Sequence, residues 1–270
     1  MDKITQIFDQ VAGDYDAPSN RFFPFAADQL TAKMQLHGRQ RMLDVATGTG
    51  VVAVSAAQMA RTGRVLAIDL SSAMLARAQA AADKMALDNI DFFEMDGQAL
   101  TFKSDYFDHV LCGFGLFFFP DMSAGLTSWL RVLKPGGRVG FTSFAETAFE
   151  PMAGLFFARL SAFGLTFERL SVQTLDHPDK CTQVLSEAGF TEVVVESAAL
   201  GYHLANAEQW WDVIWGTALR GFLAALSPDA LAQFKTEHLA EVATLATEKG
   251  LWMPVDVLFS IARKASAETC

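Results

Sequence analysis

Residues 43–50, Leu43-Asp44-Val45-Ala46-Thr47-Gly48-Thr49-Gly50, decide the fold of this chain, because an apolar run leads there into a turn of small residues. Glycines in such a turn let a ligand approach the backbone closely. The apolar pattern from Val51 onward predicts a helix, whose first N–H groups would be free to bind a carboxylate or a phosphate. This stretch therefore predicts a strand, a ligand-binding turn and a helix.

On both sides of this stretch, short β-rich runs alternate with helical runs. The order is strand, helix, strand, helix, strand, loop, strand, helix, strand, which predicts a parallel sheet with crossover helices on both faces. We expect strands at 42–46, 65–69, 90–94, 107–112 and 138–143, and helices at 51–61, 71–85 and 122–133. Pro135-Gly136-Gly137 is expected to stop the last of these helices. The pattern predicts an α/β, doubly wound, Rossmann-like fold.

The flanking segments complete a predicted seven-stranded sheet. Helices at 2–12 and 20–37 form an N-terminal flank over 1–40, and further helices cover 149–169 and end near 188–189. A sixth strand is expected at 192–197, and a last, antiparallel strand at 255–262. Amphipathic helices over 206–249 precede that strand, with Trp210, Trp211 and Trp215 on apolar faces that more often pack in a core than form a substrate cage. Without a repeat or a flexible linker, residues 1–270 are expected to form a single domain.

Composition narrows the class of protein. With 51% hydrophobic and 19% charged residues, the chain can bury a large core, and its net charge of -10 repels the phosphate backbone of nucleic acids. No apolar run is long enough to cross a bilayer, and the N-terminal residues carry no signal-peptide core, so we expect no integral membrane contact and a cytoplasmic location. Its three cysteines, Cys112, Cys181 and Cys270, are scattered without metal-ligand spacing, which predicts reduced thiols and no metal site.

The glycine turn alone leaves two cofactors open. Gly48, Gly50 and Ala53 satisfy the dinucleotide fingerprint G-x-G-x-x-A, and Asp69, 19 residues beyond Gly50, is placed to accept hydrogen bonds from two ribose hydroxyls in either case. An NAD-dependent oxidoreductase is therefore one alternative. A turn that binds no ligand, with Asp44 and Asp69 acting only as caps, is the purely structural alternative.

Three further features favour S-adenosylmethionine. Asp44 lies at the entry to the turn, where it can face the amino group of a methionine, whereas a diphosphate has little use for a carboxylate there. Asp96, in Met95-Asp96-Gly97-Gln98-Ala99-Leu100, ends the third strand and can accept from an adenine amine. Leu133-Lys134-Pro135-Gly136-Gly137-Arg138 precedes the fifth strand. Together these residues resemble class I S-adenosylmethionine-dependent methyltransferases, over about residues 8–145.

The resemblance implies which residues bind S-adenosyl-L-methionine. Residues 43–50 correspond to the cofactor loop, Asp69 to the ribose acid and Asp96 to the adenine contact. The expected cofactor-binding set is Asp44, Ala46, Thr47, Gly48, Gly50, Asp69, Leu70, Met74, Asp96, Gly97, Gln98 and Cys112.

Two segments look like the ubiquinone/menaquinone C-methyltransferase branch of this class. They are Phe8-Asp9-Gln10-Val11-Ala12-Gly13-Asp14-Tyr15-Asp16 and Gly113-Phe114-Gly115-Leu116. That branch continues its Phe-Gly-Leu with Arg-Asn-Val, whereas this chain has Phe117-Phe118-Phe119. The departure puts a quinone acceptor in question while leaving the scaffold unchanged.

A small hydrophobic acceptor, aromatic or isoprenoid, is the expected methyl-group acceptor, with oxygen, carbon and nitrogen left open as the methylated atom. Phe114 and Phe117 to Phe119 follow the fourth strand and either line the acceptor pocket or pack in the core. The helical segment 206–249 is expected near the mouth of that pocket.

His203, beside Tyr202, is the one candidate general base, although a lone histidine is more often structural. No role is assigned to the other histidines. Two further alternatives stay open: a noncatalytic partner that binds the cofactor, and nucleic-acid methylation, against which both the acidity and Cys112-Gly113-Phe114-Gly115 count, since base-methylating enzymes carry Asn-Pro-Pro-Tyr there.

Overall fold

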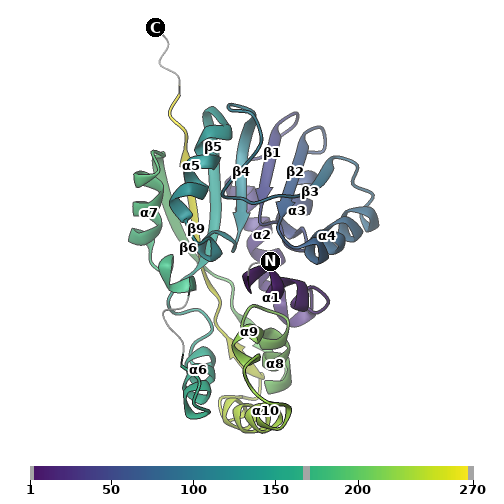
Figure 1. Cartoon of the computed structure of the whole chain (residues 1–270), viewed down its shortest axis with the longest axis vertical. Helices are drawn as coiled ribbons and strands as arrows, with labels where there is room; N and C mark the ends of the chain where they lie inside the picture. The colour runs from purple at the N-terminus through teal and green to yellow at the C-terminus, as the bar shows by residue number, and fades with distance from the viewer. Residues whose placement is uncertain (1–2, 167–170, 267–270) are drawn as a thin grey trace.

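The computed structural model describes residues 3–166 and 171–266. Its main sheet has seven strands in the order β3-β2-β1-β4-β5-β9-β6 (Figure 1). The strands are β1 Arg41–Val45, β2 Arg64–Asp69, β3 Ile90–Glu94, β4 Phe107–Gly113, β5 Leu133–Phe144, β6 Thr191–Ala199 and β9 Asp256–Arg263. The first five run parallel, whereas β9 is antiparallel to β5 and β6. The predicted doubly wound α/β fold with an antiparallel last strand is confirmed.

Strand order reverses at β1, which pairs with β2 on one side and β4 on the other. Parallel α/β sheets bind ligands outside the carboxyl ends of the strands at such a point, because the flanking loops leave there in opposite directions. Met42, Leu43 and Val45 are fully buried and anchor β1 in the core. The loop that follows Val45 is therefore held at the middle of the sheet edge.

The helices that cover the sheet form two groups. One contains α2 Phe22–Lys33, α3 Val51–Met59 and α4 Ser72–Lys84, with α3 in contact with both others; the second contains α5 Met122–Val132 and α7 Pro178–Glu187, which pack on each other. Side-chain caps fix where two of them begin. The hydroxyl of Ser71 accepts from the N–H of Met74 at the start of α4, and the carboxylate of Asp121 accepts from the N–H of Ala124 at the start of α5.

The remaining helices gather beyond one end of the sheet, where Figure 1 shows α8, α9 and α10 near α1 and α6. They are α1 Lys3–Val11, α6 Met152–Ala162, α8 Ala207–Trp215, α9 Arg220–Leu223 and α10 Pro228–Ala243, with short 3-10 turns η1 Pro18–Asn20, η2 Leu116–Phe118 and η3 Ser171–Thr174. A two-stranded sheet of β7 Tyr202–Leu204 and β8 Leu251–Met253 joins the two ends of the segment that holds α8 to α10. None of the described helices has the length and hydropathy needed to cross a bilayer.

Some boundaries differ from the prediction. The helix expected at 20–37 begins at Phe22 and ends at Lys33, and the one expected at 149–169 is α6, which ends at Ala162 before Gly164, whose φ is +78°. Residues 167–170 of that prediction lie outside the described residues. The β7–β8 pair was not predicted, because strands of three residues show no recognisable alternation.

The prediction for Pro135-Gly136-Gly137 was wrong in detail. Helix α5 already ends at Val132, and the three residues belong to β5 instead of forming a separate turn. The N–H of Gly136 donates to the carbonyl of Lys264, so the segment bonds across to the C-terminal strand region. Gly136 has a φ of +76°, which bends the strand without ending it.

A buried hydrogen bond joins the helices of the C-terminal segment. The indole Nε1 of Trp210 in α8 donates to Nε2 of His238 in α10 over 2.9 Å, and both side chains are fully buried. Burial lowers the pKa of His238 to about 4. Burial, with a smaller contribution from the charge of Arg138, also lowers the pKa of His109 in β4 to about 4.

These two histidines make the folded chain sensitive to acid. A histidine in the unfolded chain titrates near pH 6.5, so below that pH the unfolded state binds protons that the folded state excludes until about pH 4. Between pH 7 and pH 5 each histidine is expected to reduce the free energy of unfolding by about 2 kcal/mol. Urea unfolding at the two pH values measures this loss.

Variants separate the histidine contribution from that of other groups. His238→Gln and His109→Gln should each lose about 2 kcal/mol less than the parent between pH 7 and pH 5. Identical pH dependence in the parent and in both variants would contradict the prediction.

Candidate active site

The loop between β1 and α3 has the backbone that its glycines require. Gly48 and Gly50 have φ angles of +56° and +87°. A Cβ at Gly50 would lie 2.9 Å from Cβ of Ala78, so the loop packs directly on α4. The N–H of Thr47 donates to the carbonyl of Ile68 at 2.9 Å, which ties the loop to β2.

Asp44 presents an unsatisfied carboxylate oxygen under this loop. The side chain is fully buried; its Oδ2 accepts from the hydroxyl of Thr47 at 2.6 Å, whereas Oδ1 has no hydrogen-bond partner among the described residues. Burial raises the pKa of Asp44 to about 7. A buried carboxylate with a free oxygen suits an ammonium group, which would supply the missing hydrogen bond and charge.

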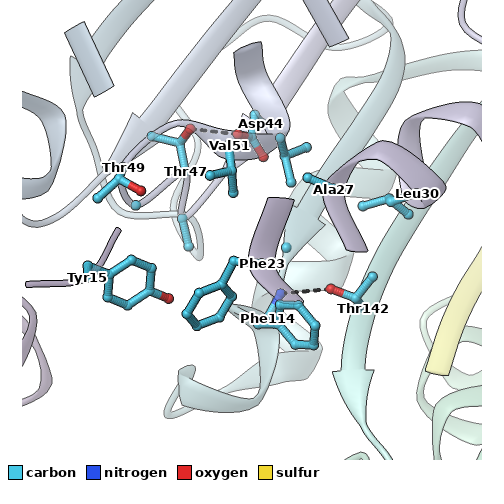
Figure 2. A pocket seen from close by; sticks show the side chains of 14 residues that line it. Tyr15, Phe23, Ala27, Leu30, Asp44, Thr47, Thr49, Val51, Phe114 and Thr142 are labelled. Carbon is cyan, nitrogen blue, oxygen red and sulfur yellow. Dashed lines mark hydrogen bonds between the residues drawn. The ribbon is translucent and has the colours of Figure 1, made fainter. Parts of the chain in front are cut away.

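Figure 2 shows the small cavity that Asp44 faces, with Thr47 on one side and the rings of Tyr15, Phe23 and Phe114 opposite. Its volume is about 30 Å³. The hydroxyl of Thr142 in β5 accepts from the N–H of Phe114 at 3.0 Å and so holds the backbone that follows β4.

Asp69 lies at the end of β2, in a second cavity of about 100 Å³. Its carboxylate accepts from the N–H of Gly48 at 2.8 Å and from the N–H of Ser71 at 2.9 Å, and burial raises its pKa. The two cavities adjoin, since Tyr15, Ala46, Gly48, Gly113 and Phe114 line both.

The segment after β3 forms the far wall of the second cavity. Asp96 accepts from the N–H of Gln98 at 2.8 Å, and the indole of Trp129 donates to the carbonyl of Gly97 at 2.9 Å. A Cβ at Gly97 would lie 2.5 Å from Cγ1 of Val45, so only glycine fits at this position. Asp96, Gly97 and Gln98 are thus fixed beside one another.

Most of the residues expected to bind the cofactor line these two cavities. They are Asp44, Ala46, Thr47, Gly48, Asp69, Leu70, Asp96, Gly97 and Gln98. Gly50 shapes the loop without lining either cavity. Met74 is buried in α4 against Val11 and Ala12, and Cys112 is fully buried in β4, where burial raises the pKa of its thiol.

His203 is not brought to this site. It is the middle residue of β7, and because side chains alternate along a strand, the buried Tyr202 and Leu204 leave His203 exposed on the opposite side. Its ring lies against that of Trp252, with 4.9 Å between centroids, and it lines neither of these two cavities nor a larger third one. The hypothesis of His203 as a general base is therefore not retained.

The third and larger cavity, of about 470 Å³, continues from the second. The two share Ile4, Phe8, Tyr15, Phe114 and Phe118. Among residues 3–166 and 171–266, ten phenylalanines line the larger cavity: Phe8, Phe22, Phe23, Phe114, Phe117, Phe118, Phe144, Phe149, Phe157 and Phe222. Phe119 lines the second cavity instead, and Trp210, Trp211 and Trp215 line none of the three.

The C-terminal helical segment supplies one wall of this aromatic cavity. Its lining residues there are Val213, Thr217, Ala218, Leu219, Gly221 and Phe222. Whether segment 206–249 caps an acceptor there stays a prediction.

Tyr15 is the site residue that our reasoning from the sequence missed. It lines all three cavities and stacks on Phe23 with 4.6 Å between ring centroids. Burial and the nearby carboxylates of Asp69 and Asp16 raise the pKa of its phenol, so the hydroxyl stays a hydrogen-bond donor. Its only signal in the sequence is membership of the motif at 8–16, which gives no position in space.

Known proteins resemble this chain in sequence. The chain is 29% identical to the ubiquinone/menaquinone biosynthesis C-methyltransferase UbiE of Francisella tularensis, over 74% of this chain and 87% of that protein. It is 28% identical to the nocamycin O-methyltransferase of Saccharothrix syringae, over 89% of this chain and 91% of that protein.

Among solved structures, the cyclase SpnF superposes with a TM-score of 0.62 at 18% identity, covering 98% of this chain and 96% of that one, which shows a shared fold. The model of the ubiE/COQ5 methyltransferase family matches residues 1–206, which include β1 to β6, the glycine loop, Asp44, Asp69 and Asp96. The chain therefore belongs to the ubiE/COQ5 methyltransferase family.

Proposed function

We propose that this S-adenosylmethionine-dependent methyltransferase transfers its methyl group to a small, hydrophobic, aromatic or isoprenoid acceptor bound in the 470 Å³ cavity. One observation carries the proposal: Tyr15 and Phe114 line all three cavities, so the cofactor cavities adjoin the aromatic one. The net charge of -10 also supports a small molecule over a nucleic acid as acceptor.

Each part of the cofactor has a matching group. The free oxygen of Asp44 suits the amino group of the methionine moiety, Asp69 the ribose hydroxyls, and the Asp96–Gln98 segment the adenine. This assignment puts the sulfonium beside Tyr15 and Phe114, because these residues lie where the methionine and adenosine cavities adjoin the acceptor cavity.

Methyl transfer from a sulfonium needs few catalytic side chains. A sulfonium methyl is already electrophilic, so the protein must mainly align the acceptor with it and exclude water. Rings packed closely around the junction serve both tasks: Phe114 stacks on Phe144 with 4.3 Å between centroids and lies 5.6 Å from Phe23.

The residues around the aromatic cavity support an acceptor other than the quinone of the UbiE relatives. The family model stops at residue 206, before the segment that walls the aromatic cavity, whereas the nocamycin O-methyltransferase matches 89% of the chain. Phe117 and Phe118 also line the cavity where the quinone branch has Arg-Asn. We therefore place a hydroxyl oxygen first among the methylated atoms to be tested and a ring carbon second.

The buried cysteines Cys112 and Cys181 are both free thiols, which supports the proposed cytoplasmic location.

Filling the cavity tests the proposal. Ala153 in α6 lines the aromatic cavity and neither cofactor cavity. Ala153→Trp should leave the affinity for S-adenosylhomocysteine unchanged and lower methyl transfer about 100-fold or more, because displaced reactants lose alignment. Transfer is measured by mass spectrometry on a panel of phenols, hydroxynaphthoquinones and demethylated quinones.

Ala232→Trp is the matched control, since Ala232 is exposed on α10 and lines none of the cavities. It should retain parental activity. Full activity of Ala153→Trp, or methylation of nucleic acid alone, would overturn the proposed acceptor site.

A further inference from the structure

We propose that Glu146 binds the polar head of the acceptor, and that this head is a hydrogen-bond donor, a protonated amine or a hydroxyl, and not an acid. The inference rests on the proposed acceptor role of the aromatic cavity, which Glu146 lines. It adds to that role a specificity-determining residue and the class of group that the residue selects.

Glu146 is held in place by its backbone neighbours. It follows β5, and the loop it belongs to is fixed on strand β9: the N–H of Ala145 donates to the carbonyl of Asp256 at 2.9 Å, and the hydroxyl of Thr147 donates to the carboxylate of Asp256 at 2.6 Å. The N–H of Glu146 itself donates to the carbonyl of Asp176 at 3.2 Å. A side chain on such a fixed backbone can select a ligand, because little order must be gained on binding.

Its carboxylate is free to bind a ligand. Of the three acidic residues that line the cavity in the described part of the chain, Asp176 pairs with Lys180 at 2.5 Å and Glu150 accepts from the N–H of Gly154 at 3.2 Å. Within residues 3–166 and 171–266, the carboxylate of Glu146 has no hydrogen-bond or ion-pair partner. Glu146 is exposed, so a ligand must replace the water around its carboxylate, and a hydrogen-bond donor can do this whereas an acid cannot.

The surroundings favour a donor or a cation over an anion. Phe144 and Phe149 line the same cavity, with 5.0 Å between their ring centroids, and aromatic faces attract cations. Among the described lining residues, three carboxylates stand against one lysine, Lys3. An acceptor whose head is a carboxylate or phosphate would meet like charge at this wall, which makes it a poor ligand.

Probes of one shape and three head groups test the inference without knowledge of the acceptor. They are 6-phenylhexylamine, 6-phenylhexanol and 6-phenylhexanoate, titrated calorimetrically into protein saturated with S-adenosylhomocysteine. We expect the amine and the alcohol to bind at least about tenfold more tightly than the acid, with the amine tightest. In Glu146→Gln the amine should lose about tenfold in affinity and the acid should gain.

Glu187→Gln is the matched control, because Glu187 is an exposed carboxylate in α7 that lines none of the three cavities, and it should change each affinity less than about threefold. The proposal is overturned if the three probes bind alike, or if Glu146→Gln leaves their order unchanged. In either case, loss of probe binding in Ala153→Trp would still support the cavity as the acceptor site. If no probe binds the parent protein, both the acceptor site and the role of Glu146 fail.

Discussion

Asp69→Ala will bind S-adenosylhomocysteine about 100-fold or more weakly than the parent protein. Hydrogen bonds to a charged group contribute about 1.5–3 kcal/mol each, and the ribose offers two hydroxyls to this carboxylate. The variant also frees the N–H groups of Gly48 and Ser71, which now donate to Asp69, so part of the loss comes from a less ordered loop. Isothermal titration calorimetry measures the affinity directly.

The control for this experiment is Asp91→Ala. Asp91 is a carboxylate on the neighbouring strand β3 that pairs with Arg64 and lines none of the cavities. The Asp91→Ala variant should bind S-adenosylhomocysteine as tightly as the parent protein does. An Asp69→Ala protein that binds within about threefold of the parent, or one that prefers NAD, would refute the assignment of the second cavity to adenosine.

Asp44→Asn should make the protein more stable while it weakens cofactor binding. The carboxylate is fully buried, one of its oxygens has no partner, and burial raises its pKa to about 7. An amide keeps the oxygen that accepts from Thr47 but carries no charge, so the cost of burying the ionised group disappears. The lost charge removes the proposed partner of the cofactor's ammonium, for which we expect at least about tenfold weaker binding.

The stabilisation should depend on pH in a defined direction. Asp44 titrates near pH 3.8 in the unfolded chain and near pH 7 in the folded one, so its contribution to stability is intact below pH 3.8 and is lost as pH rises to about 7. At pH 8 the cost is up to about 4 kcal/mol, and at pH 5 it is about 2 kcal/mol. Urea unfolding should therefore show a larger gain for Asp44→Asn at pH 8 than at pH 5; an equal gain at both would contradict burial of the ionised carboxylate as its cause.

Much of the fold could be predicted from the sequence because the pattern is redundant. Each of the seven main strands was placed within one or two residues, apart from the start of β5, since buried parallel strands are continuous apolar runs between recognisable helices. Asp44, Asp69 and Asp96 could be assigned together because carboxyl ends of neighbouring parallel strands meet at one edge. The start of β5 was not predicted, because proline and glycine indicate a turn but do not exclude a strand.

The acceptor side was less predictable for a physical reason. Its wall combines Phe8, Phe144 and Phe222, which lie far apart in the sequence, and no periodicity links such residues. The composition suggested an apolar acceptor but could not say which rings face a cavity. The exposed position of His203 could not be predicted because its strand is too short to reveal which side of the pleat faces solvent.

The small β7–β8 sheet has a consequence for how this enzyme can diversify. Leu204 pairs with Leu251, so the segment between them leaves and re-enters the fold at neighbouring points. Such a segment can vary more readily than the rest of the chain, because the strands of the seven-stranded sheet and the cofactor loop lie outside it. Evolution can then change the methyl acceptor while S-adenosylmethionine stays the methyl donor.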